Sequence, residues 1–126
     1  MTNTKQFIDH LYSAFNQRHI DEVLSHMTED VSWPKASEGG RIQGKEEIRF
    51  YWKRQWGQFN AQVEPLEVTE RNGTVEVTVR QLVKSLKGEV ISDTEVQHVY
   101  TIQNGLIQRM EQRESEKASV AFHKNG

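Results

Sequence analysis

The chain has no cysteine, which excludes disulfide bonds, thiolate catalysis and metal sites built on sulfur ligands. Long apolar runs are also missing. No stretch approaches the roughly 18 residues that a membrane-spanning helix needs, and no apolar signal core follows Met1. These absences predict a cytoplasmic protein without a membrane partner.

The sequence also lacks a large excess of positive or negative charge. The 16 Lys and Arg residues are interspersed with 18 Asp and Glu residues, so the net charge is only −2. Binding to a phosphate backbone needs a basic patch or stripe, and the sequence contains no such cluster. We therefore expect no nucleic-acid partner.

The spacing of the histidines argues against a metal site. No two of the five histidines form an HxH or HExxH motif, and they fall on different predicted elements. They are His10, His19, His26, His98 and His123. The expectation is that the protein holds no metal and no cofactor.

What the chain does contain is a series of segments in which apolar and polar residues alternate, separated by Gly-containing turns. The turns are Asn72-Gly73, Lys87-Gly88 and Asn104-Gly105. Asn-Gly favours a type I′ hairpin because both central residues need positive φ, which Gly accepts freely and Asn tolerates. Four consecutive antiparallel strands are therefore predicted, over residues 59–71, 74–86, 89–103 and 106–113. Pro65 predicts a bulge or an edge position in the first of them.

Three helices are predicted ahead of these strands. Apolar residues recur at helical spacing over residues 7–15, 20–27 and 45–56. The third helix follows Gly44 and ends at Gly57, and its apolar face carries two of the three tryptophans.

A short strand over residues 31–33 is predicted between the second and third helices. Pro34 must end it or place it at an edge, and residues 35–41 are expected to form a loop. Helices followed by a run of hairpins indicate an α+β fold with a curved sheet wrapped over the helices. At 126 residues, the chain predicts one domain over residues 1–114 and a polar tail over residues 115–126.

Strand parity places two polar side chains on otherwise apolar faces, because residues two apart share a face. Gln81 follows a row of valines on one strand, and His98 precedes Tyr100 on the next. A buried amide or imidazole without a partner costs about 1–3 kcal/mol, so these two either satisfy each other or a Trp or Tyr, or they face a pocket. The residues that would line such a pocket are Trp33, Trp52, Trp56, Tyr100 and Met110. The tryptophans could equally be ordinary core residues.

The order of these elements resembles the SnoaL-like branch of the NTF2-like superfamily over about residues 4–114. The features that carry the resemblance are the strand ending in Trp33-Pro34, the Gly44-opened helix with Tyr51-Trp52, and the segment HVYTIQNGLIQRM from His98 to Met110. The resemblance implies a cone-shaped α+β fold in which a strongly bent antiparallel sheet and three N-terminal helices enclose a pocket. It also implies a homodimer formed through the sheet. The family contains both enzymes and pure binding modules, so the fold alone assigns no reaction.

The resemblance extends to ketosteroid isomerases, which use a carboxylate base and an oxyanion hole made by a Tyr and a protonated Asp. The position of the base corresponds to Trp33, which cannot accept a proton. The helix-1 tyrosine corresponds to Leu11, with Tyr12 one residue away, and the oxyanion-hole Asp corresponds to His98. Most of the isomerase set is therefore absent.

Two functional hypotheses follow. The first is a module that binds a small hydrophobic molecule, with Gln81 and His98 as the polar groups of the pocket. The second is a SnoaL-like cyclase, isomerase or lyase in which His98 transfers a proton on an oxygenated hydrophobic substrate and Gln81 or Tyr100 orients an oxygen. Asp30 is a second catalytic candidate, for which a solvated, turn-capping role is the alternative.

Overall fold

The computed structural model describes residues 4–35 and 38–114. In chain order the elements are α1 (Thr4–Asn16), α2 (Ile20–Leu24), β1 (Met27–Pro34), β2 (Arg41–Gln43), α3 (Lys45–Trp56), β3 (Phe59–Arg71), β4 (Thr74–Ser85), β5 (Val90–Gln103) and β6 (Leu106–Glu114). The predicted tail over residues 115–126 lies outside the described residues. Within the described part of the chain, no helix is long and apolar enough to cross a membrane.

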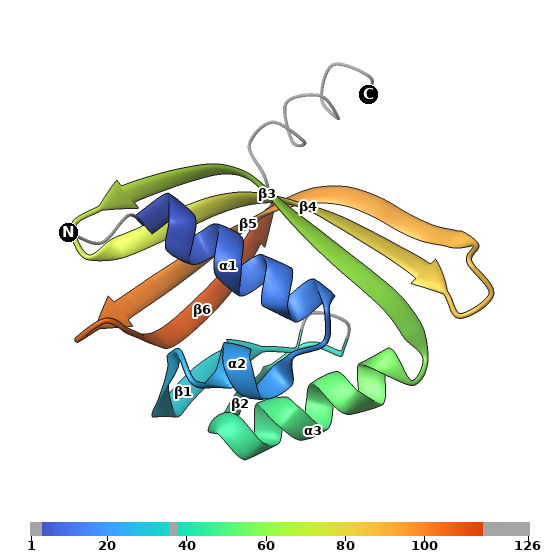
Figure 1. Cartoon of the computed structure of the whole chain (residues 1–126), viewed down its shortest axis with the longest axis horizontal. Helices are drawn as coiled ribbons and strands as arrows, with labels where there is room; N and C mark the ends of the chain where they lie inside the picture. Colours follow the sequence, from blue (N-terminus) through green and yellow to red (C-terminus); the bar gives the residue numbers. More distant parts are fainter. Residues whose placement is uncertain (1–3, 36–37, 115–126) are drawn as a thin grey trace.

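A single six-stranded sheet of order β2-β1-β6-β5-β4-β3 forms the body of the protein. The sheet is strongly bent, and α1 lies across its concave face, with α3 leading into β3 (Figure 1). Helix α3 contacts β1 and β2 at one edge of the sheet and also β3 at the opposite edge. One helix can touch both edges only because the sheet curls, so the predicted α+β cone is confirmed.

The hairpin turns follow the prediction from their Asn-Gly pairs. At the β3–β4 turn Asn72 and Gly73 have φ of 45° and 85°, and at the β5–β6 turn Asn104 and Gly105 have φ of 53° and 79°. Positive φ at both central residues is the type I′ geometry, whose twist matches that of the flanking strands. The register of β3 against β4 shifts just after Pro65, so a bulge lies there as predicted.

Three details differ from the sequence-based predictions. Strand β1 pairs parallel with β6, so the sheet is not wholly antiparallel; no hairpin joins these two strands, and no turn fixes their relative direction. The second helix, predicted over residues 20–27, stops at Leu24. Met27 is instead the first residue of β1, and its side chain is buried like those of Val31 and Trp33 on the same strand. Arg41, predicted to be the last residue of a loop, instead begins β2, which pairs with the end of β1.

The core lies between the concave face of the sheet and the helices. In α1 the buried side chains of Ile8, Leu11 and Tyr12 fall at positions i, i+3 and i+4, which places them on one face of the helix. Asn16 is the last residue of the helix, and its side-chain amide pairs with the backbone of Val63 in β3. Asn16 Nδ2 donates to the Val63 carbonyl at 2.8 Å, and Asn16 Oδ1 accepts from the Val63 N–H at 2.9 Å. This pair of bonds fixes the end of α1 against the edge strand β3.

Gly44 sets the direction in which α3 leaves the sheet. Its φ of 97° and ψ of 151° belong to a backbone region that is essentially restricted to glycine. Its N–H donates to the Val31 carbonyl at 2.7 Å, and its own carbonyl accepts from the Ile48 N–H, which starts the helix. The helix then ends at Gly57, which has ordinary right-handed helical φ and ψ.

These two glycines give a matched stability prediction. Gly44→Ala should lower the free energy of unfolding by roughly 1–3 kcal/mol, because alanine is strained at this φ and ψ. Gly57→Ala should be neutral or slightly stabilising, because the nearest atom to its new Cβ is the Arg54 carbonyl oxygen at an ordinary 3.4 Å. Urea denaturation of both variants measures the difference, and equal effects would contradict the role assigned to Gly44.

Candidate functional site

A cavity of about 370 Å³ lies inside the cone, which is within the size range of small-molecule sites. Its walls come from all three helices and from β1, β3, β4, β5 and β6. The lining residues are Leu11, Tyr12, Phe15, Val23, Trp33, Pro34, Tyr51, Trp52, Gln55, Trp56, Phe59, Ala61, Gln62, Val63, Gln81, Val83, Ile91, Ser92, His98, Tyr100, Met110 and Gln112. No charged residue is among the described residues that line it.

An aromatic cluster forms one side of the cavity. Trp33 and Trp52 meet edge to face, with ring centroids 5.5 Å apart, and Phe15 lies 5.2 Å from both Trp52 and Trp56. Such T-shaped contacts hold the rings at fixed angles. The guanidinium of Arg18 covers Trp56 at 4.6 Å from the ring centroid. The indoles therefore present rigid apolar surfaces to whatever occupies the cavity.

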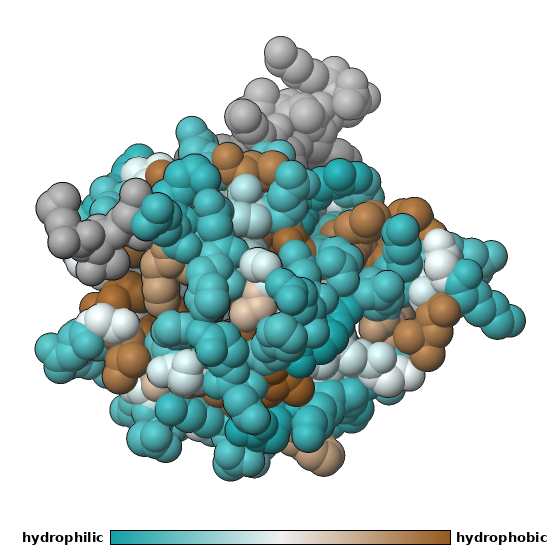
Figure 2. Space-filling view, viewed as in Figure 1, coloured by the Kyte–Doolittle hydropathy of each residue, from teal (hydrophilic) through white to brown (hydrophobic). Residues whose placement is uncertain are grey.

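The rim near the β4–β5 hairpin is apolar as well. Leu86, Val90 and Ile91 are 64%, 61% and 53% exposed, and Ile91 also lines the cavity. Figure 2 shows the matching hydrophobic surface over this hairpin, at the right of the view. Apolar side chains at the edge of a cavity lower the cost of bringing an apolar molecule to it.

A chain of hydrogen bonds forms the polar part of the wall. The Tyr12 hydroxyl lies 2.6 Å from His98 Nδ1 and 2.7 Å from the Tyr100 hydroxyl. On the other side of the imidazole, Gln81 Nε2 lies 3.4 Å from His98 Nε2 and donates to Gln112 Oε1 at 3.2 Å. Every buried side-chain nitrogen and oxygen in the described part of the chain has a partner.

Burial keeps this array uncharged. Desolvation lowers the pKa of His98 to about 4, so the imidazole is neutral at pH 7. Burial also raises the pKa of Tyr12 well above its usual value, with the neighbouring Tyr100 adding to the effect, and burial likewise raises the pKa of Tyr100. The cavity thus offers neutral donors and acceptors and no ion.

The neutral imidazole can be satisfied in either tautomer. With the proton on Nε2, the ring donates toward Gln112 and accepts the Tyr12 O–H at Nδ1, while Tyr100 donates to Tyr12. With the proton on Nδ1, the ring donates to Tyr12, Tyr12 donates to Tyr100, and Nε2 accepts from Gln81. The donor–acceptor order of these hydrogen bonds can therefore reverse to suit a ligand that offers either a donor or an acceptor.

The SnoaL-like domain profile matches residues 8–110, which is most of the chain. The chain belongs to the SnoaL-like family. Its structure is also similar to solved structures of NTF2-like proteins. No curated protein matches it significantly.

Three solved structures illustrate the relationship. An NTF2-like protein of unknown function from Burkholderia pseudomallei is 22% identical with a TM-score of 0.78, over 96% of this chain and 97% of that one. TerC, co-crystallised with polyporic acid, is 28% identical with a TM-score of 0.74, over 93% and 92% of the two chains. A proposed polyketide cyclase from Pseudomonas putida is 17% identical with a TM-score of 0.71, over 96% and 98%.

Within this SnoaL-like cone, most of the sequence-predicted site residues meet at the cavity. Trp33, Trp52, Trp56, Gln81, His98, Tyr100 and Met110 all line it. Asp30 does not: it is exposed on β1, and its carboxylate accepts a hydrogen bond from the Thr28 hydroxyl at 2.9 Å. Asp30 lies within β1 and caps no turn there, so its exposed position fits the solvated alternative better than a catalytic role. The functional roles of the other seven remain predictions.

Two residues of the polar array were not among the predicted site residues. Tyr12 stands at the centre of the array, and helical spacing from Ile8 could have identified it, since it lies at i+4 on the buried face. Gln112 shares a strand face with Met110, so parity on β6 pointed to it as well.

The neutral state of His98 predicts a pH-dependent stability. Its pKa is about 4 in the folded protein and about 6.5 in the unfolded chain, so the unfolded chain takes up the proton first as the pH falls. The contribution of His98 to the free energy of unfolding is therefore complete above pH 6.5 and is lost as the pH falls toward 4. The loss is on the order of 3 kcal/mol. Urea denaturation between pH 7.5 and pH 4 should show a steeper loss for the natural protein than for His98→Gln. Parallel losses would contradict a neutral buried imidazole.

Proposed function

We propose that this SnoaL-like domain binds a small, largely apolar molecule that carries at least one hydrogen-bonding oxygen. The observation behind the proposal is the composition of the cavity, which combines rigid aromatic walls with a neutral array centred on Tyr12, His98 and Tyr100. An apolar cavity with a few convergent polar groups is the usual composition of a small-molecule site.

The proposed ligand is uncharged or only weakly charged where it meets the array. An isolated ion in this cavity would lose its hydration without gaining a counter-ion, because none of the described lining residues is charged. An oxygen of a ketone, phenol or quinone type can instead join the Tyr12–His98 chain as acceptor or donor. The co-crystal of TerC, a related chain of 28% identity, with polyporic acid supports a small organic molecule as the ligand class.

Catalysis by proton transfer is the alternative, in which the domain is a cyclase, isomerase or lyase acting through His98. The similarity to a proposed polyketide cyclase favours it. General acid–base catalysis works best with a group whose pKa lies near the operating pH, whereas burial lowers the pKa of His98 to about 4 and raises that of Tyr12. Such groups are a weak base and a weak acid, so the array suits hydrogen bonding to a ligand better than proton transfer.

Tryptophan fluorescence tests the binding proposal, with polyporic acid as the probe. A molecule bound against Trp33, Trp52 and Trp56 should quench their emission in a saturable way. Tyr12→Phe removes the hydroxyl at the centre of the array and should raise the dissociation constant about tenfold, the cost of one lost buried hydrogen bond. Ser13→Ala, which removes an exposed hydroxyl from the next position of α1, should have no effect.

The same titrations should include a panel of polyketides and enones, with absorbance recorded for turnover. The binding proposal fails if neither polyporic acid nor any member of the panel quenches the natural protein saturably. If a compound is converted, and His98→Gln loses conversion while keeping its affinity, the catalytic alternative replaces the binding proposal.

We also propose that two copies pair through the outer face of the sheet, as the family resemblance implies. This face carries charged side chains, among them Arg80, which makes two hydrogen bonds to Asp93, and Glu111, which accepts from Arg109 and Arg113. A polar contact of this kind should weaken as salt rises. Sedimentation equilibrium at low salt should give twice the mass of one chain, and a monomer at every concentration would contradict the dimer.

A further inference from the structure

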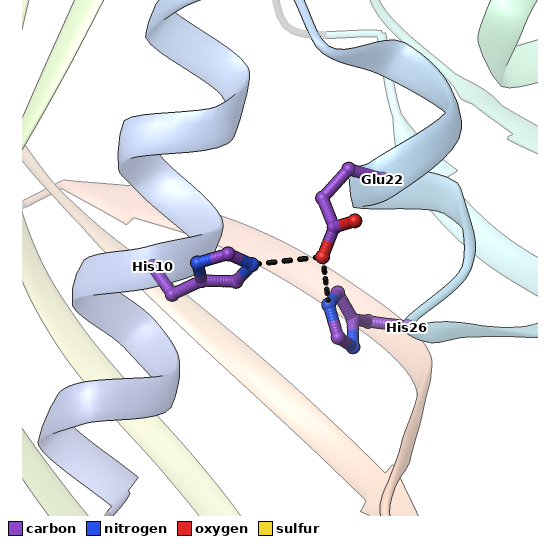
Figure 3. A group of neighbouring side chains, drawn as sticks. All are labelled: His10, Glu22 and His26. Carbon is purple, nitrogen blue, oxygen red and sulfur yellow. Dashed lines mark hydrogen bonds and ion pairs between the residues drawn. The ribbon is translucent and has the colours of Figure 1, made fainter.

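A second cluster of functional side chains lies on the outside of the helical layer. Two histidines, His10 from α1 and His26 from the α2–β1 connection, point at the same carboxylate, that of Glu22 on α2 (Figure 3). Glu22 Oε2 lies 2.8 Å from His10 Nε2 and 3.1 Å from His26 Nε2. The expectation of no metal site rested on the absence of HxH and HExxH motifs and on histidines that fall on different elements, and the fold brings two of them together.

The arrangement is close to that of a metal centre. The three ligand atoms all lie within 4.8 Å of one another. Bonds of about 2.0–2.2 Å in tetrahedral geometry would place ligand atoms about 3.3–3.6 Å apart. Glu22 Oε2 lies 3.1 Å from His26 Nε2 and 2.8 Å from His10 Nε2, so both nitrogen–oxygen distances need to lengthen by less than an ångström. The His10 side chain is exposed, so it can adjust its position without disturbing the core.

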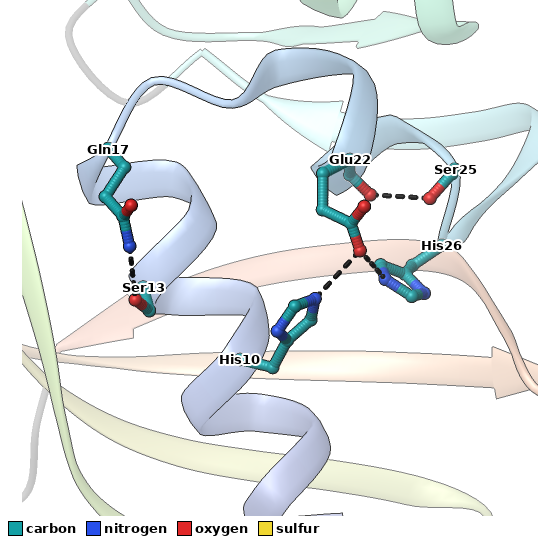
Figure 4. A network of polar contacts seen from close by, with 6 residues as sticks. All are labelled: His10, Ser13, Gln17, Glu22, Ser25 and His26. Carbon is teal, nitrogen blue, oxygen red and sulfur yellow. Dashed lines mark hydrogen bonds and ion pairs between the residues drawn. The ribbon is translucent and has the colours of Figure 1, made fainter.

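The backbone around the cluster is held on several sides. The His26 carbonyl accepts from the Ile107 N–H at 2.8 Å, which ties the start of β1 to β6. The Ser25 hydroxyl donates to the Glu22 carbonyl at 2.6 Å (Figure 4). The His26 ring packs edge to face against Phe7, with centroids 5.2 Å apart, and against His10 at 5.8 Å. Two of the three ligands therefore start from fixed positions.

We propose that His10, Glu22 and His26 form a binding site for a divalent transition-metal ion of the zinc type. Two imidazoles and one carboxylate are a ligand set that suits zinc, cobalt, nickel and copper, whereas magnesium and calcium prefer oxygen ligands throughout. Each imidazole binds the ion through Nε2 and keeps its proton on Nδ1. The remaining coordination positions are open to water, so the ion links α1 to the α2–β1 connection.

This site is separate from the cavity. On α1 the cavity-lining residues Leu11 and Tyr12 face inward, whereas His10 and Ser13 lie on the exposed side. Figure 4 shows His10 and Ser13 on α1 with Glu22 and His26 opposite His10. Metal binding is therefore expected to leave ligand binding in the cavity unchanged, and its test does not depend on the proposed function.

Isothermal titration of the untagged full chain with zinc chloride at pH 8 tests the site. One ion should bind per chain, and the melting temperature should rise in its presence. His10→Gln and His26→Gln should each raise the dissociation constant at least about tenfold, since even outer-sphere partners of metal ligands are worth 10–100-fold. Cobalt should bind with the visible absorption of a tetrahedral or five-coordinate centre, and magnesium should not bind.

His19→Gln is the matched control, because His19 is an exposed histidine on the neighbouring turn that is not part of the cluster. It should bind zinc as the natural protein does. The proposal is overturned if zinc at millimolar concentration neither releases heat nor shifts the melting temperature. It is equally overturned if His19→Gln weakens binding as much as His10→Gln, or if His10→Gln binds unchanged. All three substitutions are at exposed or half-buried positions, and melting without metal verifies that each variant folds.

Discussion

An imidazole and two phenols buried in an apolar cone have little access to bulk water, so they satisfy one another. Tyr12 does so from α1, and His98 and Tyr100 from β5, through bonds of 2.6 and 2.7 Å between residues more than 80 positions apart. An unpartnered polar group there would cost about 1–3 kcal/mol, a large part of the stability of a small domain. The array therefore fixes both the docking of α1 on the sheet and the chemistry of the cavity.

The parts of the fold that depend on local chemistry could be predicted from the sequence. Asn72-Gly73 and Asn104-Gly105 specify hairpins because their backbone angles suit few other residues, and the alternation of the strands then assigns inward faces. That reasoning places Gln81 and His98 toward the interior. The helical period similarly turns Trp52 inward, so spacing identifies part of the cavity wall, including its tryptophans and its imidazole.

The rest depends on how distant elements meet. Strand β1 joins β6 in parallel without a connecting turn, so no local signal records the pairing. Leu11 and Tyr12 differ by only about 100° around the helix, and tertiary packing decides that the phenol reaches His98. The meeting of His10 with His26 likewise depends on the turn between α1 and α2. Sequence spacing identifies candidates on one element, whereas the cluster between elements needs the fold.

The two polar clusters differ in the property that decides their chemistry, which is solvation. The array around His98 is buried, so its groups stay neutral and can offer hydrogen bonds but only weak acidity or basicity. Around His10 the groups are largely exposed, and the Glu22 carboxylate stays ionised because hydrogen bonds from His10 and His26 lower its pKa. A charged, solvated ligand set attracts a cation, and a neutral, desolvated one selects an apolar molecule. The same helix therefore presents opposite chemistries on its two faces, one toward the cavity and one toward solvent.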